Sequence, residues 1–282
     1  MLTSTVVKLR AMNDGRLPLA TGEYGYAAFL SLIRKVAPDL AQALHNAGTR
    51  QPFTVSPLQG RMRWCRGRWQ VRTGADCWMR FTILDPALYT AFSRYFAEAQ
   101  TFDLKITLDA VNFAVEEVTT TQGKWSGYAT FKQLLTEASD DPEIPLRFHS
   151  LTAFSLGDLS GVGPRMAMFP EAELVFGSLL TKWNTFADIL LEPQPLRELM
   201  KDQCILVKRY RLESRVWQFQ RHLQPGFVGY CVYEVKGATA EQRRYFNTLA
   251  DFAFYAGVGY RTTMGMGQCR RIADKQNNNS DR

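Results

Sequence analysis

Hydrophobic and polar positions follow two different periods along this chain. Apolar residues three and four positions apart predict helices, and strict alternation predicts half-buried strands. In the first half, segments that look extended predict strands over 6–10, 53–58, 78–84, 102–107 and 112–118. The helical period predicts helices over 26–36, 39–45 and 86–100. If the two adjacent helices and the last two strands are each counted as one step, the order of strand, helix, two strands, helix and strand is that of a ferredoxin-like domain.

The same order returns in the second half of the chain. Predicted strands cover 146–156, 204–211, 227–235 and 266–272, and predicted helices cover 170–183 and 241–255. The segment 139–145 is polar, acidic and broken by prolines, which is typical of a boundary between domains. We therefore predict an α+β fold of two tandem ferredoxin-like domains, over 1–140 and 146–274, with a disordered tail over 275–282.

Composition narrows the class of protein. The 282 residues are 46% hydrophobic and 12% aromatic, which indicates a globular protein rather than a disordered one. The formal net charge of +7 favours a polyanionic partner, such as RNA, DNA or an acidic surface. Composition alone does not choose among these partners.

Cysteines and histidines give no sign of a metal site. The five cysteines are scattered without a Cys-x-x-Cys pair, and none of the three histidines lies at zinc-ligand spacing from a cysteine. We therefore expect reduced thiols, no metal and no cofactor. The first residues lack the apolar core of a signal peptide, and no apolar stretch approaches the length of a membrane span. We expect a cytoplasmic protein without a membrane partner.

The most informative motif is a glycine-rich loop over 257–267. Its four glycines are Gly257, Gly259, Gly265 and Gly267. Glycine allows positive φ angles and leaves backbone N–H groups open to a ligand. A dinucleotide-binding fingerprint runs from strand to glycines to helix, whereas this loop follows a helix and has Thr262 where the third glycine belongs. A Walker A loop would need Gly-Lys before Ser or Thr, so both nucleotide-cofactor motifs are excluded.

This loop, with the helix before it and the strand after it, resembles the C-terminal signature of the RAMP superfamily. The resemblance is to the CRISPR repeat endoribonucleases in particular, the sixth of the numbered Cas families. Segments 146–154 and 175–184 are similar to the strand and helix that open that family's second domain. The resemblance implies metal-independent cleavage of precursor CRISPR RNA within its repeats. A ribose 2′-hydroxyl would attack the adjacent phosphate, the 5′-oxygen would leave, and a 2′,3′-cyclic phosphate would remain.

Such a cleavage needs a proton acceptor, a proton donor and positive charge beside the phosphorane. Histidine suits both proton-transfer roles because its unperturbed pKa lies near neutral pH. His45 ends a predicted helical turn and precedes the strand Phe53 to Ser56, as the active histidine does in many family members. We predict His45 as general acid or base and Arg50, the only cation in the following loop, as its electrostatic partner. The residues alone leave open that His45 caps a helix and that Arg50 anchors phosphate.

The chain departs from the family in the neighbours of His45. Some members pair the active histidine with a tyrosine in the first helix and with a lysine shortly after it. Here Tyr24 and Tyr26 lie at the very start of that helix, and no lysine lies between His45 and Gly60. The other active-site residues therefore stay open.

The segment 61–72 holds five arginines and two tryptophans but no acidic residue. Arginine grips phosphates and stacks on bases, and tryptophan offers a stacking face. We predict RNA binding by Arg61, Arg63, Arg66, Arg68 and Arg72. The alternative is a solvated basic hairpin whose tryptophans pack inward.

Further basic positions lie in the second half. Lys208, Arg209 and Arg211 form a cluster that is diluted by Glu213, His222 lies in a basic turn, and Arg261 lies in the glycine-rich loop. RNA stem-loops are recognised through shape, backbone and 2′-hydroxyl contacts as well as through bases. We predict RNA contacts at these five basic residues and at the four glycines of the loop.

Together these features predict a metal-independent endoribonuclease that binds CRISPR repeat RNA and keeps hold of the mature crRNA. One alternative is a RAMP subunit that holds guide RNA without cutting it, among other Cas subunits of an effector complex. A second alternative is a general pair of RRM-like RNA-binding domains. It is disfavoured because the chain lacks an aromatic RNP motif.

Overall fold

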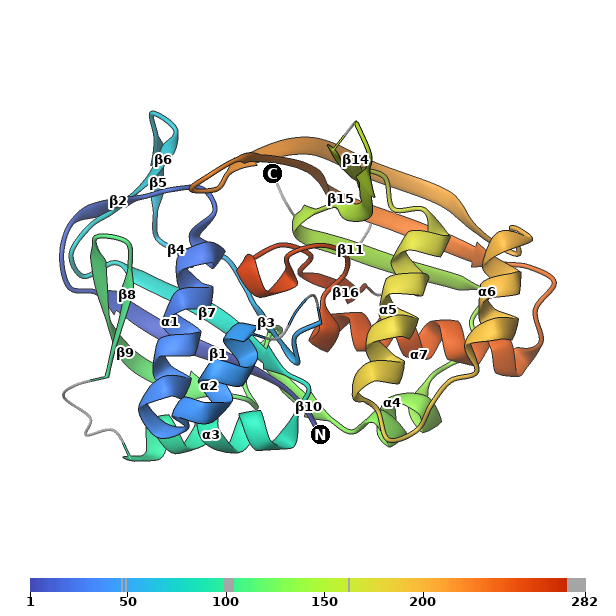
Figure 1. Cartoon of the computed structure of the whole chain (residues 1–282), viewed down its shortest axis with the longest axis horizontal. Helices are drawn as coiled ribbons and strands as arrows, with labels where there is room; N and C mark the ends of the chain where they lie inside the picture. Colours follow the sequence, from blue (N-terminus) through green and yellow to red (C-terminus); the bar gives the residue numbers. More distant parts are fainter. Residues whose placement is uncertain (47, 49, 99–103, 162, 273–282) are drawn as a thin grey trace. The chain divides into compact units, whose positions relative to one another are not determined.

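The computed structural model describes residues 1–46, 48, 50–98, 104–161 and 163–272 (Figure 1). The chain forms two compact units, neither of which is continuous in sequence. Unit 1 consists of Met1–Ala129, Trp217–Gln224 and Arg261–Met266, and unit 2 of Thr130–Val216, Pro225–Tyr260 and Gly267–Arg282. Two short segments of the second half thus belong to the unit that the first half forms. The predicted tail over 275–282 lies outside the described residues.

An antiparallel sheet forms the centre of unit 1. Its strands are β1 (Leu2–Ala11), β3 (Phe53–Val55), β4 (Gln59–Gly60), β7 (Asp76–Ile83), β8 (Lys105–Leu108), β9 (Val111–Thr119) and β10 (Gly127–Ala129). The spatial order is β3-β7-β1-β9-β8, with β4 paired to β7 and β10 paired to β1. If β1, β3, β7 and β9 are counted along the chain, the order is fourth, first, third, second, which is that of a ferredoxin-like sheet.

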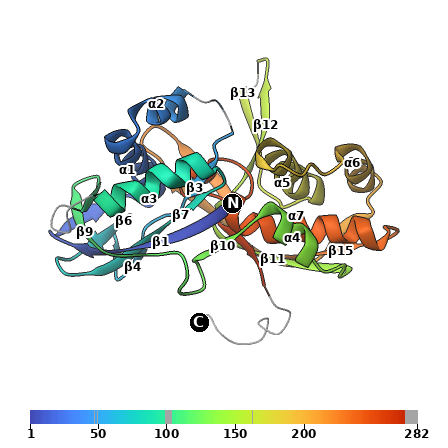
Figure 2. The same cartoon turned by 90° about the horizontal axis from the view of Figure 1, so that it is seen from below.

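Three helices lie on one side of this sheet, as Figure 2 shows. They are α1 (Thr21–Val36), α2 (Pro38–Asn46) and α3 (Pro86–Glu98). Aromatic rings join the two layers: the ring of Phe29 lies 4.3 Å from that of Phe53 and 5.6 Å from that of Phe81. Helix α1 begins at Thr21 rather than at the predicted residue 26. Its first turns contain glycines, which disfavour helices and so hide this start from the sequence pattern. Close packing requires glycine there. A Cβ added at Gly25 would lie 2.3 Å from the Cε atom of Met79.

The sheet of unit 2 has the same strand order. Across the sheet, its strands are β14 (Ile205–Gln218), β15 (Leu223–Val235), β11 (Glu143–Thr152) and β16 (Cys269–Arg271). Its helices are α4 (Phe131–Glu137), α5 (Ala172–Phe186), α6 (Pro193–Lys201) and α7 (Ala240–Ala256). The ring of Phe176 on α5 meets those of Tyr233 on β15 and Phe246 on α7 edge to face, at 5.1 and 5.3 Å. Both predicted ferredoxin-like repeats are therefore present.

Several elements of unit 2 escaped the sequence analysis. The structure adds α4, α6 and a hairpin of β12 (Phe154–Leu159) and β13 (Gly163–Ala167), and it lengthens β14 and β15 toward each other. Most residues of β12 and most of β14 are exposed on both faces of their strands. Such strands carry no alternation of apolar and polar residues, so the hydrophobic pattern does not reveal them.

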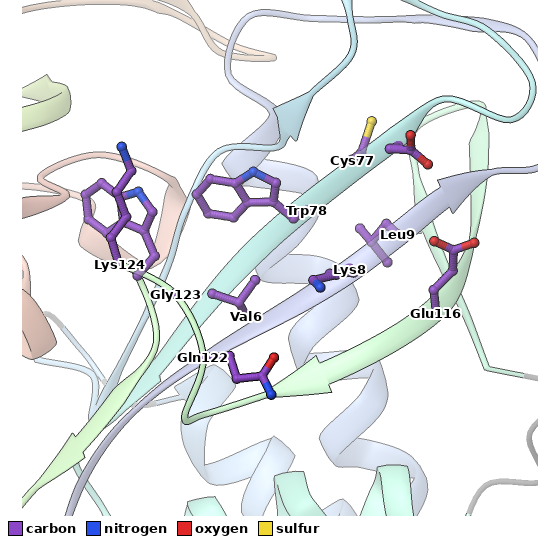
Figure 3. Close-up of a pocket in the computed structure, with 11 residues that line it drawn as sticks. Val6, Lys8, Leu9, Cys77, Trp78, Glu116, Gln122, Gly123 and Lys124 are labelled. Carbon is purple, nitrogen blue, oxygen red and sulfur yellow. The ribbon is translucent and has the colours of Figure 1, made fainter. Parts of the chain in front are cut away.

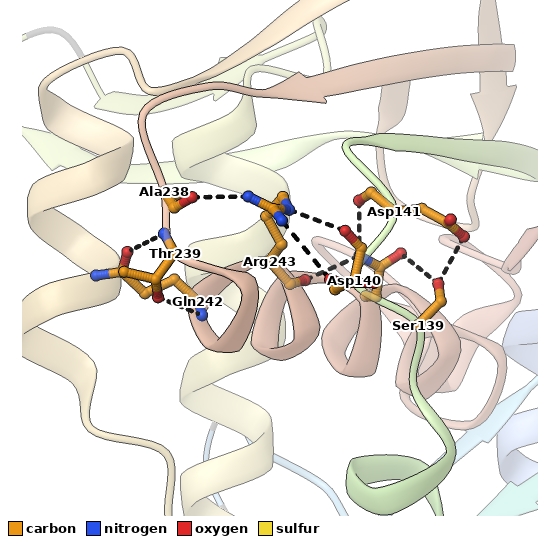
Figure 4. Close-up of polar contacts among 8 residues, drawn as sticks. Ser139, Asp140, Asp141, Ala238, Thr239, Gln242 and Arg243 are labelled. Carbon is orange, nitrogen blue, oxygen red and sulfur yellow. Dashed lines mark hydrogen bonds and ion pairs between the residues drawn. The ribbon is translucent and has the colours of Figure 1, made fainter.

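The acidic segment before β11 is fastened to helix α7 within unit 2 (Figure 4). Arg243 donates from Nε to the carbonyl oxygen of Asp140 at 2.9 Å, and Asn247 donates from Nδ2 to that of Asp141 at 3.0 Å. A capping box at Thr239 fixes the start of the same helix. The segment is therefore held on a helix rather than free, and the domain bounds at 140 and 146 stay a prediction.

Among the described residues, no helix combines the length and the apolar character that crossing a membrane requires.

Candidate functional site

His45 lies exposed in the last turn of α2. Its neighbour Leu44 is buried, and Gln51 donates from Nε2 to the Leu44 carbonyl oxygen at 2.8 Å. These contacts fix the end of the helix while the imidazole stays in solvent.

Arg50 lies exposed in the loop after α2, of which residues 47 and 49 are outside the described part. No ion pair joins Arg50 to a carboxylate in the described part of the chain. The pairing of Arg50 with His45 in one active site stays a prediction.

The strand that follows, from Phe53 to Ser56, is entirely buried. The Phe53 ring stacks on Tyr26 at 6.0 Å, the hydroxyl oxygens of Thr54 and Thr82 lie 2.6 Å apart, and Ser56 Oγ accepts a backbone N–H of β7 at 2.8 Å. This pattern is thus explained by packing. Burial also raises the pKa of Tyr26, so its phenol stays protonated.

The four glycines of the glycine-rich loop all have positive φ angles, of 61°, 79°, 92° and 69° in chain order. Gly257, Gly265 and Gly267 are buried, and Gly259 is partly exposed. A Cβ added at Gly259 would lie 2.4 Å from the carbonyl oxygen of Ala153, which leaves no room for a side chain. The glycines therefore shape the loop, and their contact with RNA stays a prediction.

The middle of the loop packs on the start of α1 within unit 1. A short 3₁₀ turn, η1 (Thr262–Met264), contacts both α1 and β3. At the closest point two glycines meet, because a Cβ added at Gly22 would lie 2.4 Å from the Cα atom of Gly265. Thr21 Oγ1 accepts the backbone N–H of Leu58 at 2.8 Å and fixes the same end of the helix.

Two residues predicted separately, His222 and Arg261, meet at the ring of Phe219 in unit 1. The imidazole of His222 stacks on this ring at 5.3 Å, with 6° between the planes, and the Arg261 guanidinium carbon lies 5.2 Å from its centroid. Glu23 of α1 accepts the backbone N–H of Gln220 at 3.0 Å. The tip between β14 and β15, the glycine-rich loop and α1 thus form one cluster. Phe219 carries no motif, so the sequence analysis missed it.

Lys182 holds the start of the glycine-rich loop within unit 2. Its Nζ donates to the carbonyl oxygens of Ala256 at 2.7 Å and Gly257 at 3.3 Å, at the end of α7. Burial lowers the pKa of Lys182 to about 7. The sequence analysis did not single out this lysine, because helical periodicity gives no sign of what its amine reaches.

The arginine-rich segment folds as a hairpin. Its strands β5 (Arg63–Cys65) and β6 (Arg68–Val71) join β2 (Gly15–Leu17) in a small sheet with the order β2-β6-β5. The turn between them is left-handed, with φ of 50° at Arg66 and 76° at Gly67, as a tight hairpin requires. Trp64 and Trp69 form a cross-strand pair with ring centroids 4.9 Å apart.

All five predicted arginines of this hairpin are exposed, but two have carboxylate partners from elsewhere in unit 1. Arg61 lies 3.7 Å from Asp76, and Arg72 lies 3.2 Å from Asp14. The absence of acidic residues within the segment therefore does not mean that every arginine is unpaired. Such exposed pairs contribute little to stability.

The second basic cluster is more fully neutralised. Lys208 Nζ lies 2.6 Å from Glu143 and 2.7 Å from Glu234, and Arg209 lies 3.3 Å from Glu143. Hydrogen bonds to both carboxylates raise the pKa of Lys208. Arg211 is exposed on the same strand. The cluster thus offers less free positive charge than its sequence suggests.

A pocket of about 370 Å³ opens beside β1 and β7 in unit 1 (Figure 3). The rings of Trp78 and Trp125 lie 6.5 Å apart in it, and the guanidinium of the buried Arg80 lies 5.1 Å from the Trp125 ring. Lys8 and Lys124 add amines to the lining. The volume is in the range of small-ligand pockets, about 300–1,000 Å³. None of the residues predicted from sequence lines it.

Acidic, histidine and cysteine side chains do not gather in threes at any place in the described residues where they could hold a metal ion.

Comparisons with known families cover nearly the whole chain. The family model described as the CRISPR Cas6 N-terminal domain matches residues 1–136, and that described as CRISPR-associated endoribonuclease Cas6 matches residues 146–269. The chain belongs to the Cas6 family. The resemblance inferred from the glycine-rich loop and its flanking segments is confirmed.

Individual Cas6 proteins show the same likeness. The chain is 32% identical over 106 residues to the Cas6 endoribonuclease of Streptococcus thermophilus, a match that spans 36% of this chain and 41% of that protein. A solved Cas6 product complex is 28% identical, with a TM-score of 0.81 over 96% of this chain and 100% of its own. A RAMP protein described as binding different RNA substrates is 15% identical, with a TM-score of 0.62 over 96% of this chain and 100% of its own, and shows the fold alone. The predicted α+β fold with tandem ferredoxin-like domains is confirmed.

Proposed function

We propose that this Cas6-family chain is an endoribonuclease that cleaves precursor CRISPR RNA within its repeats and retains the mature crRNA. The observation that carries the proposal is the whole-chain fit to Cas6, in two family models and in the similarity to a Cas6 product complex. An exposed histidine at a fixed helix end and an exposed arginine hairpin support it. CRISPR repeat RNA is the proposed partner, and other Cas subunits are proposed partners if the protein works within an effector complex.

The proposed step is a metal-independent transesterification. The ribose 2′-oxygen forms a bond to phosphorus while the bond from phosphorus to the 5′-oxygen breaks, which leaves a 2′,3′-cyclic phosphate and a free 5′-hydroxyl. A base removes the 2′-hydroxyl proton, and an acid gives a proton to the departing 5′-oxygen. His45 takes one of these roles, and Arg50 stabilises the charge on the phosphorane.

A second candidate is a RAMP subunit that binds guide RNA without cutting it. Tyr26, one of the two tyrosines at the start of α1, stacks on Phe53 instead of standing free. No lysine follows His45 before Gly60. The partners that some family members supply to their active histidine are thus not provided in the same way here.

The test is cleavage of end-labelled repeat RNA in excess EDTA by the wild type, His45→Ala and His149→Ala. His149 is exposed on β11 and serves as the matched control. We expect the wild type to produce a cyclic-phosphate end, and His45→Ala to cut about 10²–10⁴-fold more slowly, the usual contribution of a positioned acid or base. His149→Ala should cut within about twofold of the wild type, as expected for a surface substitution.

Each other outcome rejects a part of the proposal. Undiminished cutting by His45→Ala would assign the proton transfer to another residue, such as His222. Binding without cutting by the wild type would favour the non-catalytic subunit. Cutting only after divalent cations are restored would reject the metal-independent step.

A further inference from the structure

The small sheet β2-β6-β5 has one face toward the core of unit 1 and one toward solvent. In its register, Gly15 lies opposite Val71, and Leu17 lies opposite Trp69. Leu17 and Val71 are buried, and a Cβ added at Gly15 would lie 2.4 Å from the side chain of Val111. Because directly opposed residues of an antiparallel pair point to the same side, these residues define the inner face.

The outer face carries arginines from all three strands. Arg16 on β2 and Arg63 on β5 both lie opposite Gln70 of β6, on its two sides. Arg68 lies two positions before Gln70 on β6, so it points to the same side. Neighbouring strands are about 4.8 Å apart and residues rise about 3.3 Å each along a strand. Arg16 and Arg63 therefore stand about 10 Å apart across the sheet, with Arg68 about 7 Å along it.

This outer face, defined by Arg16, Arg63 and Arg68, is positively charged without compensation. All three side chains are exposed, and the three strands contain no Asp or Glu. No ion pair involves any of the three in the described residues, whereas the flanking Arg61 and Arg72 have carboxylate partners. The arginines of this hairpin thus fall into two groups, those that pair with a carboxylate and those that do not.

We infer that Arg16, Arg63 and Arg68 form one phosphate-binding surface for the backbone of the repeat RNA. Arg16 lies outside the arginine-rich segment and is a further RNA-binding residue. The inference rests on the proposed function. Arginine presents a planar fork that matches phosphate oxygens, and a sheet holds such forks at fixed spacing. Trp64 and Trp69 lie on the opposite side of the hairpin from these arginines, and Trp64 is 47% exposed there, so the arginine face itself contacts the RNA backbone through its guanidinium groups.

Arg16→Gln tests the inference, with Arg94→Gln as the matched control. Arg94 is an exposed arginine of the same unit on α3, where it pairs with Glu98. Dissociation constants are measured over a range of salt concentrations for repeat RNA and for random RNA of equal length. Each phosphate contact contributes about 0.7–0.9 to the slope of log K against log salt. We expect Arg16→Gln to weaken binding of both RNAs about 5–10-fold at low salt and to reduce the slope by about that amount, and Arg94→Gln to stay within about twofold.

The outcomes separate this inference from the proposed function. If the wild type binds repeat RNA with a steep salt dependence but Arg16→Gln matches Arg94→Gln, Arg16 does not contact RNA phosphates and the inference is overturned. A loss confined to repeat RNA would overturn it too, because phosphate contacts are uniform across sequences. A wild type that does not bind repeat RNA would reject the proposed function instead. Arg16→Lys keeps the charge, so it should restore the slope, and Arg63→Gln with Arg68→Gln tests the same face if Arg16→Gln folds poorly.

Discussion

The sequence predicts RNA contacts for both the glycine-rich loop and the arginine hairpin, but the two segments differ in how far they are exposed to solvent. Three of the four loop glycines are buried, and Gly259 lies against the backbone of Ala153. The arginines of the hairpin are exposed, and three of the six on it and on its neighbour β2 stand on one solvent face. The loop supplies shape, and the hairpin supplies charge.

This difference explains why the loop, rather than the hairpin, carries the family signature. A position that needs a positive φ or has no room for a Cβ restricts the sequence to glycine. An arginine on an exposed face is restricted only by its ligand, and its position can shift along a strand or to a neighbouring one. Recognition of the family and recognition of the binding residues therefore rest on different parts of this chain.

The largest effect should come from Gly259→Ala. Its φ of 79° and the Ala153 oxygen 2.4 Å from the added Cβ both oppose a side chain. We expect the free energy of unfolding to fall by about 3 kcal/mol, measured by urea denaturation. The control is Gly177→Ala in α5, where no atom lies within 4 Å of the added Cβ. It should raise stability by about 0.5–1 kcal/mol. If both variants were equally stable, the loop glycines would be there for a ligand and the contrast would fail.

The next largest effect should be the difference in RNA affinity between two double variants that remove the same amount of charge. Arg63→Gln with Arg68→Gln removes two unpaired arginines, and Lys208→Gln with Arg209→Gln removes two cations that pair with Glu143 and Glu234. We expect the first to weaken repeat-RNA binding about 10–100-fold at low salt and the second less than about threefold. Stability should respond in the opposite order, with a small loss only in the second, because only that variant breaks ion pairs. Equal losses of affinity would mean that net charge, and not pairing, decides where RNA binds.

Much of the fold could be predicted from the sequence, because elements with a buried face show a regular pattern of apolar residues. Most strands of the two ferredoxin-like sheets lie where apolar stretches predict them, and α7 follows from its apolar stripe and its glycine stop. The missed elements, such as β12 and the outer part of β14, are exposed on both faces. Because these strands bury neither face in a core, their sequences show no periodic pattern of apolar residues.

The candidate site was accessible only in part, because its contacts join distant segments. Neither the meeting of His222 and Arg261 at Phe219 nor the alignment of Arg16 with Arg63 leaves a local mark in the sequence. The carboxylates that pair with Lys208 lie 65 and 26 positions away. Pairing of this kind depends on strand register, which short-range patterns do not fix.

The smallest predicted effect is a pH dependence of the free energy of unfolding that comes from Lys182, at the start of the glycine-rich loop. Burial lowers the pKa of Lys182 from 10.5 to about 7, so between these values the unfolded state binds more protons at this side chain than the folded state. The free energy of unfolding therefore rises with pH across this window, in the direction opposite to that of an ion-paired lysine. Because the side chain is only half-buried, we expect Lys182→Met to remove about 1 kcal/mol of this rise between about pH 7 and about pH 9. Urea denaturation at both pH values measures it, with the exposed Lys201→Met as control. An unchanged slope would mean that the carbonyl oxygens of Ala256 and Gly257 keep Lys182 charged, and that a cation, rather than shape alone, holds the start of the loop.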